Sequence, residues 1–247
     1  GDLLCEPRVV HSPLTQVGQW RELMPLSLAA GRIPCVLEAI HRLRARRDGV
    51  PVIGNLTGPV SLAGMLVDME VLLKAMRKEP ETVHALMTFV TDQLIVYGRA
   101  LLAAGADAVC ISDPSGTGEV VGPRFFRSFT VPYLNRVLDA LNVPVKMVHI
   151  CGRLQSVYSQ LPDIHCDVFS FDAVVPVGEV RAVLPDRALM GNVSTLAMNT
   201  MTPELVRTLV RHARKSGVDI VAPACGLPTK TPLAVIQAMV DAAKEEL

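Results

Sequence analysis

The run Val145-Lys146-Met147-Val148-His149-Ile150-Cys151-Gly152 is a short apolar segment that follows Pro144 and ends in His-x-Cys-Gly. Its length and its flanking proline and glycine predict a buried β-strand. Because residues i and i+2 of a strand project to the same side, we expect His149 and Cys151 to point together. An imidazole and a thiol presented to one point are ligands that suit zinc.

A second apolar run, residues 218–222, also ends in Cys-Gly, at Cys225 and Gly226. We expect the two strand ends to meet around one metal ion, with His149, Cys151 and Cys225 as ligands. Asp172, which follows another predicted strand, is a candidate for a further position. Three protein ligands with a place left for substrate are typical of catalytic zinc, whereas structural sites use four protein ligands.

A simpler interpretation stays open at this point. His149 could be a hydrogen-bonded core histidine, and the cysteines could be small buried apolar residues, as free cysteines often are. The other polar residues at strand ends have similar alternatives, because such carboxylates commonly cap the next helix and Gly-Asn pairs commonly form turns.

Six apolar runs predict strands, and helical segments separate them. The runs begin near residues 51, 107, 145, 167, 188 and 218. This alternation indicates βαβ units and a parallel sheet. Polar residues lie at or just past the carboxyl ends of the runs: Asn55, Asp113, His149, Cys151, Asp172, Asn192 and Cys225. In a (β/α)8 barrel these ends converge on the face that carries active sites, so we predict an α/β fold of the TIM-barrel type. Asn55, Asp113 and Asn192 are the predicted substrate-binding residues.

The chain has 247 residues, the size of one (β/α)8 barrel, so we predict a single domain over residues 1–247. Six strands are fewer than a closed barrel needs. Either residues 8–11 supply a further strand, or the first βα unit or units lie outside this chain. We therefore expect a barrel that is incomplete at its N-terminal side.

Helices are predicted from the three- and four-residue spacing of apolar side chains. They are expected over residues 32–49, 60–76, 80–104, 123–141, 153–161, 178–184, 203–216 and 231–247. Thr202 is the expected N-cap of the helix that begins at Pro203. Residues 114–122 are expected to form a loop.

The composition excludes several classes of protein. Lys+Arg and Asp+Glu are equal at 24 each, so nucleic acid is not expected as a main partner. The chain has no uninterrupted apolar stretch of about 18 or more residues, which argues against a membrane span. Its first residues lack the order of a signal peptide, and its six cysteines are not spaced as a disulfide framework. We expect a cytoplasmic protein.

Several motifs together resemble one known family. They are His149-Ile150-Cys151-Gly152, residues 107–113 followed by Pro114-Ser115-Gly116, Gly191-Asn192-Val193, and Ala222-Pro223-Ala224-Cys225-Gly226-Leu227-Pro228. The chain resembles the uroporphyrinogen decarboxylase superfamily over nearly its whole length. Within that superfamily it is similar to the methylcobamide:coenzyme M methyltransferase branch.

The resemblance implies a TIM barrel that holds zinc at His149, Cys151 and Cys225. In that branch a glutamate can take a further zinc position, and the corresponding place here holds the shorter Asp172. The implied reaction moves a methyl group from a methylcobamide, carried on a small corrinoid protein, to a thiol such as coenzyme M. Two alternatives remain: a metal-free decarboxylase of the same superfamily, and a non-catalytic subunit that binds metal or docks a corrinoid protein.

Overall fold

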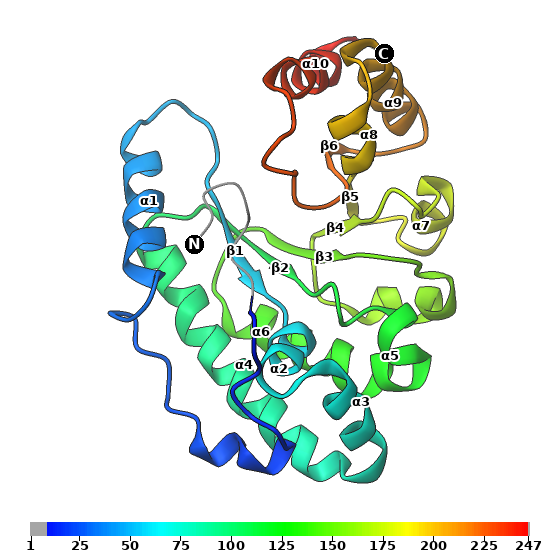
Figure 1. The fold of residues 1–247 in the computed structure, drawn as a ribbon. Coiled ribbons are helices and arrows are strands. Elements are labelled where there is room, and N and C mark those ends of the chain that lie inside the picture. The colour runs from blue at the N-terminus through cyan, green and yellow to red at the C-terminus, as the bar shows by residue number, and fades with distance from the viewer. Residues whose placement is uncertain (1–8, 247) are drawn as a thin grey trace.

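The computed structural model describes residues 9–246 and contains one parallel sheet (Figure 1). The strands are β1 (Ile53–Thr57), β2 (Ala108–Ser112), β3 (Lys146–Ile150), β4 (Val168–Phe171), β5 (Ala188–Val193) and β6 (Ile220–Pro223). Every neighbouring pair is parallel, and the order in the sheet follows the order in the chain. The six strands predicted from the sequence are thus confirmed. A sheet with strands in sequential parallel order and with helices along its outer side is the architecture of a partial (β/α) barrel.

The sheet is open in the described part of the chain, because β1 and β6 each pair on one side alone. Residues 9–11 form no strand, and Arg8 lies outside the described residues. Ile53 on β1 and Ile220 on β6 are 47% and 40% exposed. The two edge strands therefore leave part of their apolar surface uncovered in the described structure. The prediction of a single domain over residues 1–247 stays a prediction. So does the prediction that further βα units lie outside this chain.

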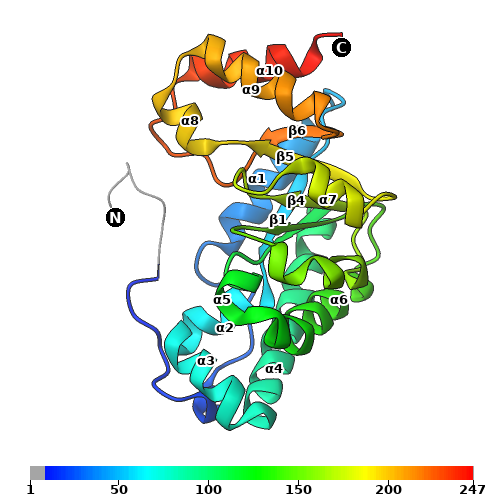
Figure 2. The ribbon, with the colours of Figure 1, turned by 90° about the vertical axis from the view of Figure 1, so that its right-hand side faces the viewer.

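Helical elements surround the sheet (Figures 1 and 2). Before β3 they are η1 (Val17–Glu22), α1 (Ile33–Ala45), α2 (Pro59–Val67), α3 (Met69–Lys78), α4 (Pro80–Ala103), α5 (Gly118–Phe125), η2 (Phe126–Thr130) and α6 (Val131–Ala140). After β3 they are η3 (Gln155–Asp163), α7 (Val177–Val183), α8 (Thr195–Thr200), α9 (Pro203–Lys215) and α10 (Leu233–Lys244). Helix α4 is packed against β1 and β2, and α9 is packed against β5 and β6. The predicted N-cap of α9 is confirmed, because the Thr202 side chain accepts a hydrogen bond from the Leu205 amide.

Four predicted segments differ from the structure. The helix expected over 123–141 is divided among the end of α5, the π-helix η2 and α6. The helix expected over 60–76 is divided at Asp68, which has a φ of 72° and caps α3 by accepting a hydrogen bond from the Glu70 amide. The loop expected over 114–122 is partly wrong, because α5 begins at Gly118 and bends at Gly122, where φ is 74°. The segment at 153–161 forms a 3-10 helix instead of an α-helix.

Three separate clusters of buried apolar side chains hold the described part of the chain together. The smallest consists of Ala108, Cys110, Met147 and Val168 on β2–β4. The other two contain more residues. The larger, here called the main core, joins β1–β4 to the helices outside them and includes Leu56, Ile111, Val148 and Phe169. The smaller, here called the C-terminal core, lies among the end of β5, β6 and helices α8–α10. Its buried members are Val193, Met198, Val206, Val210, Val235, Met239 and Ala242. Figure 1 shows α8–α10 gathered at one end of the sheet, apart from α1–α6.

Helix α4 is long and apolar enough to cross a membrane when judged by length and composition alone. It packs against α2, α6 and β1 and buries Leu86, Val90 and Leu101 in the main core. On its outer side Asp92 forms an ion pair with Arg136 of α6. These contacts are those of a core helix in a folded domain.

Candidate metal centre

The three predicted ligands meet at the carboxyl ends of β3 and β6. His149 is the fourth residue of β3, Cys151 follows that strand directly, and Cys225 lies two residues past β6. The Nε2 atom of His149 lies 2.9 Å from the Sγ atom of Cys151. The Sγ atoms of Cys151 and Cys225 are 3.4 Å apart. The strand alternation thus brings His149 and Cys151 together, and the parallel arrangement brings Cys225 to them from 74 residues further along the chain.

This donor set fits a zinc ion. The three ligand atoms all lie within 4.8 Å of one another. Bond lengths of about 2.3 Å to sulfur and about 2.0 Å to nitrogen would separate ligand atoms on a tetrahedral ion by about 3.5–3.8 Å. The separations in the structure lie close to this range, so small side-chain rotations suffice. Three soft ligands leave one tetrahedral position for a substrate atom.

The ring of His149 is held from the side by β4. His149 and Ser170 are partners in the register of β3 and β4. The Oγ atom of Ser170 lies 2.9 Å from Nδ1 of His149, and both residues are buried. This leaves Nε2 as the nitrogen that faces Cys151. Sequence reasoning did not identify Ser170, although its place two residues before Asp172 on the same strand face was a usable signal.

Two carboxylates hold the turn that follows Cys151. The amide of Gly152 donates to Oδ2 of Asp172 at 3.1 Å, and the amide of Arg153 donates to Oε2 of Glu119 at 2.8 Å. Gly152 has a φ of +75°, and a Cβ atom there would lie 2.5 Å from Oε2 of Glu119. The turn therefore needs glycine for its backbone conformation, and a Cβ atom there would also displace the Glu119 carboxylate from its hydrogen bond to Arg153.

The two thiols influence each other's proton affinity. The hydrogen bond with Cys151, and next the one with His149, hold the pKa of the Cys225 thiol well below its usual range. The same bond with Cys225, followed by burial, raises the pKa of the Cys151 thiol. The cluster thus favours a thiolate at Cys225. A thiolate is the form of cysteine that binds a metal.

Asp172 lies beside the ligands but is engaged elsewhere. Its Oδ2 atom accepts from the Gly152 amide and its Oδ1 atom accepts from the Val174 amide at 3.2 Å. Within the described residues, the group whose ligand atoms all lie within 4.8 Å of one another contains His149, Cys151 and Cys225 without Asp172. The role of Asp172 as a fourth ligand stays a prediction.

The three predicted substrate-binding residues occupy different surroundings. The amide group of Asn192 donates to the carbonyl oxygens of Asp172 and Val175, so it holds the loop between β4 and α7. Asn55 is exposed on β1, where its Oδ1 atom accepts from the Ser112 hydroxyl at 2.9 Å. The structure brings Asn192 close to the turn around Asp172, while Asn55 stands three strands away from β4.

Asp113 is fully buried and holds the start of α2. Its carboxylate accepts hydrogen bonds from the amides of Val60 and Ser61 and from the Ser61 hydroxyl. Burial raises the pKa of this carboxyl group, and this effect exceeds that of the hydrogen bonds, which lower the pKa. The geometry thus favours the helix-capping alternative for Asp113, and contact with substrate stays a prediction.

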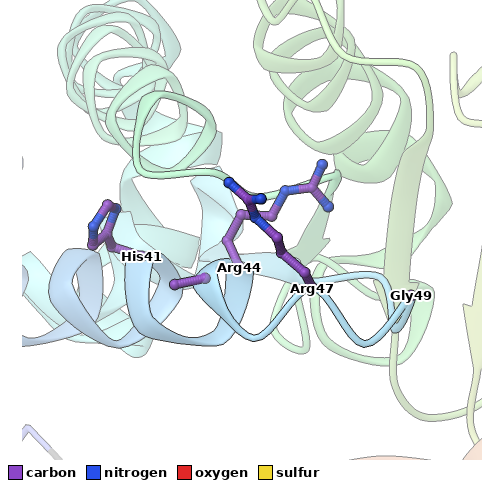
Figure 3. A pocket seen from close by; sticks show the side chains of 5 residues that line it. His41, Arg44, Arg47 and Gly49 are labelled. Carbon is purple, nitrogen blue, oxygen red and sulfur yellow. The ribbon is translucent and has the colours of Figure 1, made fainter.

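A surface depression at the carboxyl end of α1 is unrelated to the metal ligands. It has a volume of about 620 Å³ and is lined by His41, Arg44, Ala45, Arg47 and Gly49 (Figure 3). Arg44 forms an ion pair with Asp107 at 2.9 Å. The depression contains none of the residues predicted from the sequence to act on substrate or metal.

With this geometry in view, comparison with known proteins decides the family. The family model described as uroporphyrinogen decarboxylase (URO-D) matches residues 5–246. The chain belongs to the uroporphyrinogen decarboxylase family. The family resemblance predicted from the sequence is thereby confirmed.

The relatives place the chain in the methyltransferase branch of that family. It is 35% identical over 218 residues to the methylated-thiol–coenzyme M methyltransferase of Methanosarcina mazei, covering 87% of this chain and 59% of that protein. It is 31% identical over 245 residues to the methylcobamide:CoM methyltransferase MtaA of Methanosarcina barkeri, covering 98% of this chain and 72% of that protein. A solved methyltransferase from Methanosarcina mazei superposes with a TM-score of 0.90 at 28% identity, covering 98% of this chain and 73% of that one.

Proposed function

We propose that this chain carries the zinc site of a methyltransferase that moves a methyl group from a protein-bound methylcobamide to a small thiol. The observation that carries the proposal is the meeting of His149 Nε2, Cys151 Sγ and Cys225 Sγ at the carboxyl face of the sheet. The names of the methylcobamide:CoM methyltransferase relatives support the reaction class. Coenzyme M, which those names contain, is the thiol that we propose first.

The residues of the chain would hold and orient the reacting thiol. Zinc, when bound, would lower the pKa of a coordinated thiol so that its thiolate is available at neutral pH. His149, Cys151 and Cys225 supply one neutral and two anionic ligands, which makes such a site poorly suited to activating water and well suited to a thiolate. The turn at Gly152, held by Asp172 and Glu119, fixes where Cys151 stands.

The bond changes in the proposed reaction are balanced. The thiol loses its proton to solvent, its sulfur forms a bond to the methyl carbon, and the bond between that carbon and cobalt breaks. The electron pair of the broken bond stays on cobalt. The corrinoid would arrive on a small separate protein that docks over the carboxyl face of the sheet, where the three ligands lie. Bringing the two reactants into line is the main contribution of the protein.

The test is the metal content and activity of the purified protein. We expect about one zinc ion per chain and thiol-dependent loss of the methyl group from methylcobalamin. Cys151→Ala should lose both the zinc and the methyl transfer, because two ligands rarely hold zinc tightly. Cys35→Ala is the matched control, since Cys35 is an exposed cysteine on α1. A Cys151→Ala protein with full zinc and full activity would refute the proposal.

The alternative is a metal-free decarboxylase, the activity after which the family is named. It predicts a protein that lacks zinc and in which Cys151→Ala and Cys225→Ala have little effect on turnover. A non-catalytic subunit would bind zinc but would not transfer methyl groups. Zinc analysis and the methylcobalamin assay therefore distinguish all three functions.

A further inference from the structure

The register of the sheet places two serines on either side of His149. Ser112 of β2 and Ser170 of β4 are both direct partners of His149 in the strand pairing. All three side chains therefore project to the same side of the sheet. The hydroxyl of Ser112 donates to Oδ1 of Asn55 at 2.9 Å, whereas Oγ of Ser170 lies 2.9 Å from Nδ1 of His149. One of the two flanking serines thus hydrogen-bonds the imidazole, whereas the hydroxyl of the other bonds to Asn55.

The contact between Ser170 and His149 is shielded from solvent. Ser170 is 1% exposed and His149 is 8% exposed. A buried Nδ1 atom that lost this partner could not simply turn to bulk water, and leaving a buried polar group unpaired is unfavourable. The two residues come from neighbouring strands in fixed register, so the oxygen is held in place by the sheet and not by a loop.

We propose that Ser170 is a positioning residue that sets the tautomer and orientation of His149 for metal binding. Its Oγ atom accepts the hydrogen on Nδ1, which leaves the lone pair of Nε2 directed toward Cys151 and the metal position. The two nitrogens of an imidazole are distinct, and the hydrogen bond made by one determines which is free to bind a metal. Partners of this kind commonly contribute about 10–100-fold to metal affinity.

The residue that directly follows β4, Asp172, also supports the ligand site. Asp172 lies two residues beyond Ser170 and accepts from the Gly152 amide at 3.1 Å, just after Cys151. Strand β4 thus supports both ligands of the β3 end, His149 through its ring and Cys151 through the turn that follows it. This inference rests on the proposed function in one respect, namely that the cluster holds a metal.

The experiment measures zinc affinity by chelator competition in three variants. Ser170→Ala is expected to weaken zinc binding by about 10–100-fold while one ion still binds at saturation. Ser170→Thr keeps the oxygen acceptor on a side chain that suits a strand, so it should bind zinc nearly as tightly as the unchanged protein. Ser112→Ala is the matched control, because it removes a hydroxyl that flanks His149 in the register but donates its hydrogen bond to Asn55.

A second measurement reports the tautomer directly. Nitrogen NMR of the His149 ring in the zinc-loaded protein should show a protonated Nδ1 whose hydrogen exchanges slowly. In Ser170→Ala that hydrogen should exchange faster, whereas in Ser112→Ala it should not change. Thermal unfolding of the three metal-free variants separates general damage to the sheet from the effect on the ligand.

The outcomes discriminate between this inference and the proposed function. Unchanged zinc affinity in a folded Ser170→Ala protein would overturn the role of Ser170, and so would an equal loss of affinity in Ser112→Ala. Zinc binding with the expected pattern but without methyl transfer would support Ser170 and refute the proposed function. If the protein without any substitution bound no zinc, both the role of Ser170 and the proposed function would be overturned.

Discussion

The main core and the C-terminal core contribute to the metal centre in different ways. His149 and Cys151 stand at the end of β3, which the main core holds through Val148 and Ile150, and His149 is 8% exposed. Cys225 is exposed and stands on the loop between β6 and α10, two elements that the C-terminal core joins. Seven buried side chains form the C-terminal core, far fewer than form the main core. The site is therefore built across a well-covered region and a thinly covered one.

This difference leads us to expect that metal binding stabilises the thinly covered region more than the well-covered one. A cluster with few buried apolar side chains opens at a lower free energy than a large core does. A metal held by ligands from both regions would connect them and stabilise the smaller one.

Removal of the metal should loosen the C-terminal core more than the main core. When free zinc exceeds its dissociation constant by about 1,000-fold, binding stabilises the state that holds it by about 4 kcal/mol. We expect this gain to appear in hydrogen exchange as slower exchange of amides in α9 and α10, with smaller changes in β2 and β3. Cys225→Ala should lack the response. If zinc slowed amide exchange equally in all elements, the expected difference between the C-terminal core and the main core would be contradicted.

Truncation of a side chain in the C-terminal core should unfold that region first. Met198 is fully buried on α8, and its replacement by alanine is expected to cost about 2–5 kcal/mol. Limited proteolysis of Met198→Ala should cleave within residues 195–246 while residues 53–171 stay protected. Leu134→Ala, a matched change at a fully buried position of the main core, should instead expose both regions. Identical cleavage patterns would show that the two cores unfold as one unit.

Asp113 provides a test confined to the main core. Asp113→Ala removes three hydrogen bonds at the start of α2 and should lower stability by about 1–3 kcal/mol. The link between Asp113 and His149 is a backbone hydrogen bond of 2.9 Å from the Asp113 amide to the His149 carbonyl oxygen. Replacement of the side chain keeps this bond, so zinc affinity should be unchanged. Calorimetry and a zinc titration measure the two effects. An unaltered melting temperature with a raised KM for the thiol would restore the substrate-binding role predicted from the sequence.

The smallest effect concerns the start of β6. Burial alone would raise the pKa of Asp219, but the Leu189 amide and the Arg181 guanidinium outweigh it and hold this pKa below its usual range. A lowered pKa in the folded state contributes stability that is present at neutral pH and is lost as the pH falls through the folded value. Asp219→Asn should therefore cost up to about 1 kcal/mol at pH 7 and progressively less below about pH 4.

Unfolding curves of Asp219→Asn and the unchanged protein at several pH values measure this difference. Asp241→Asn is a control that also removes the carboxylate of an ion pair. Asp241 pairs with Arg207 between α10 and α9 and not at the start of a strand. A difference for Asp219→Asn that grows as the pH falls would have the wrong sign and would refute the assignment.

Local sequence patterns predicted the strands and most helices, because the formation of a strand or helix depends largely on residues that are near one another in the chain. Alternation within residues 145–151 was enough to pair His149 with Cys151, and the spacing of apolar runs was enough to indicate a parallel sheet. The break at Asp68 and the early start of α5 were missed because a positive φ and a bend at glycine depend on how the flanking helices pack. The short helix α8 was missed because six residues carry too little periodicity to predict a helix.

By itself the sequence determined which residues carry metal-binding chemistry and which of them lie at strand ends. The tertiary structure decided which partners those residues meet, because register and helix packing join positions that are distant in the chain. Ser170 lies 21 residues from His149 and contacts its ring only because β3 and β4 pair in that register. Asp113 lies at a strand end as predicted, yet the fold buries it against α2, 52 residues away at Ser61. Side-chain type is a local property, whereas burial and partnership arise when strands and helices assemble.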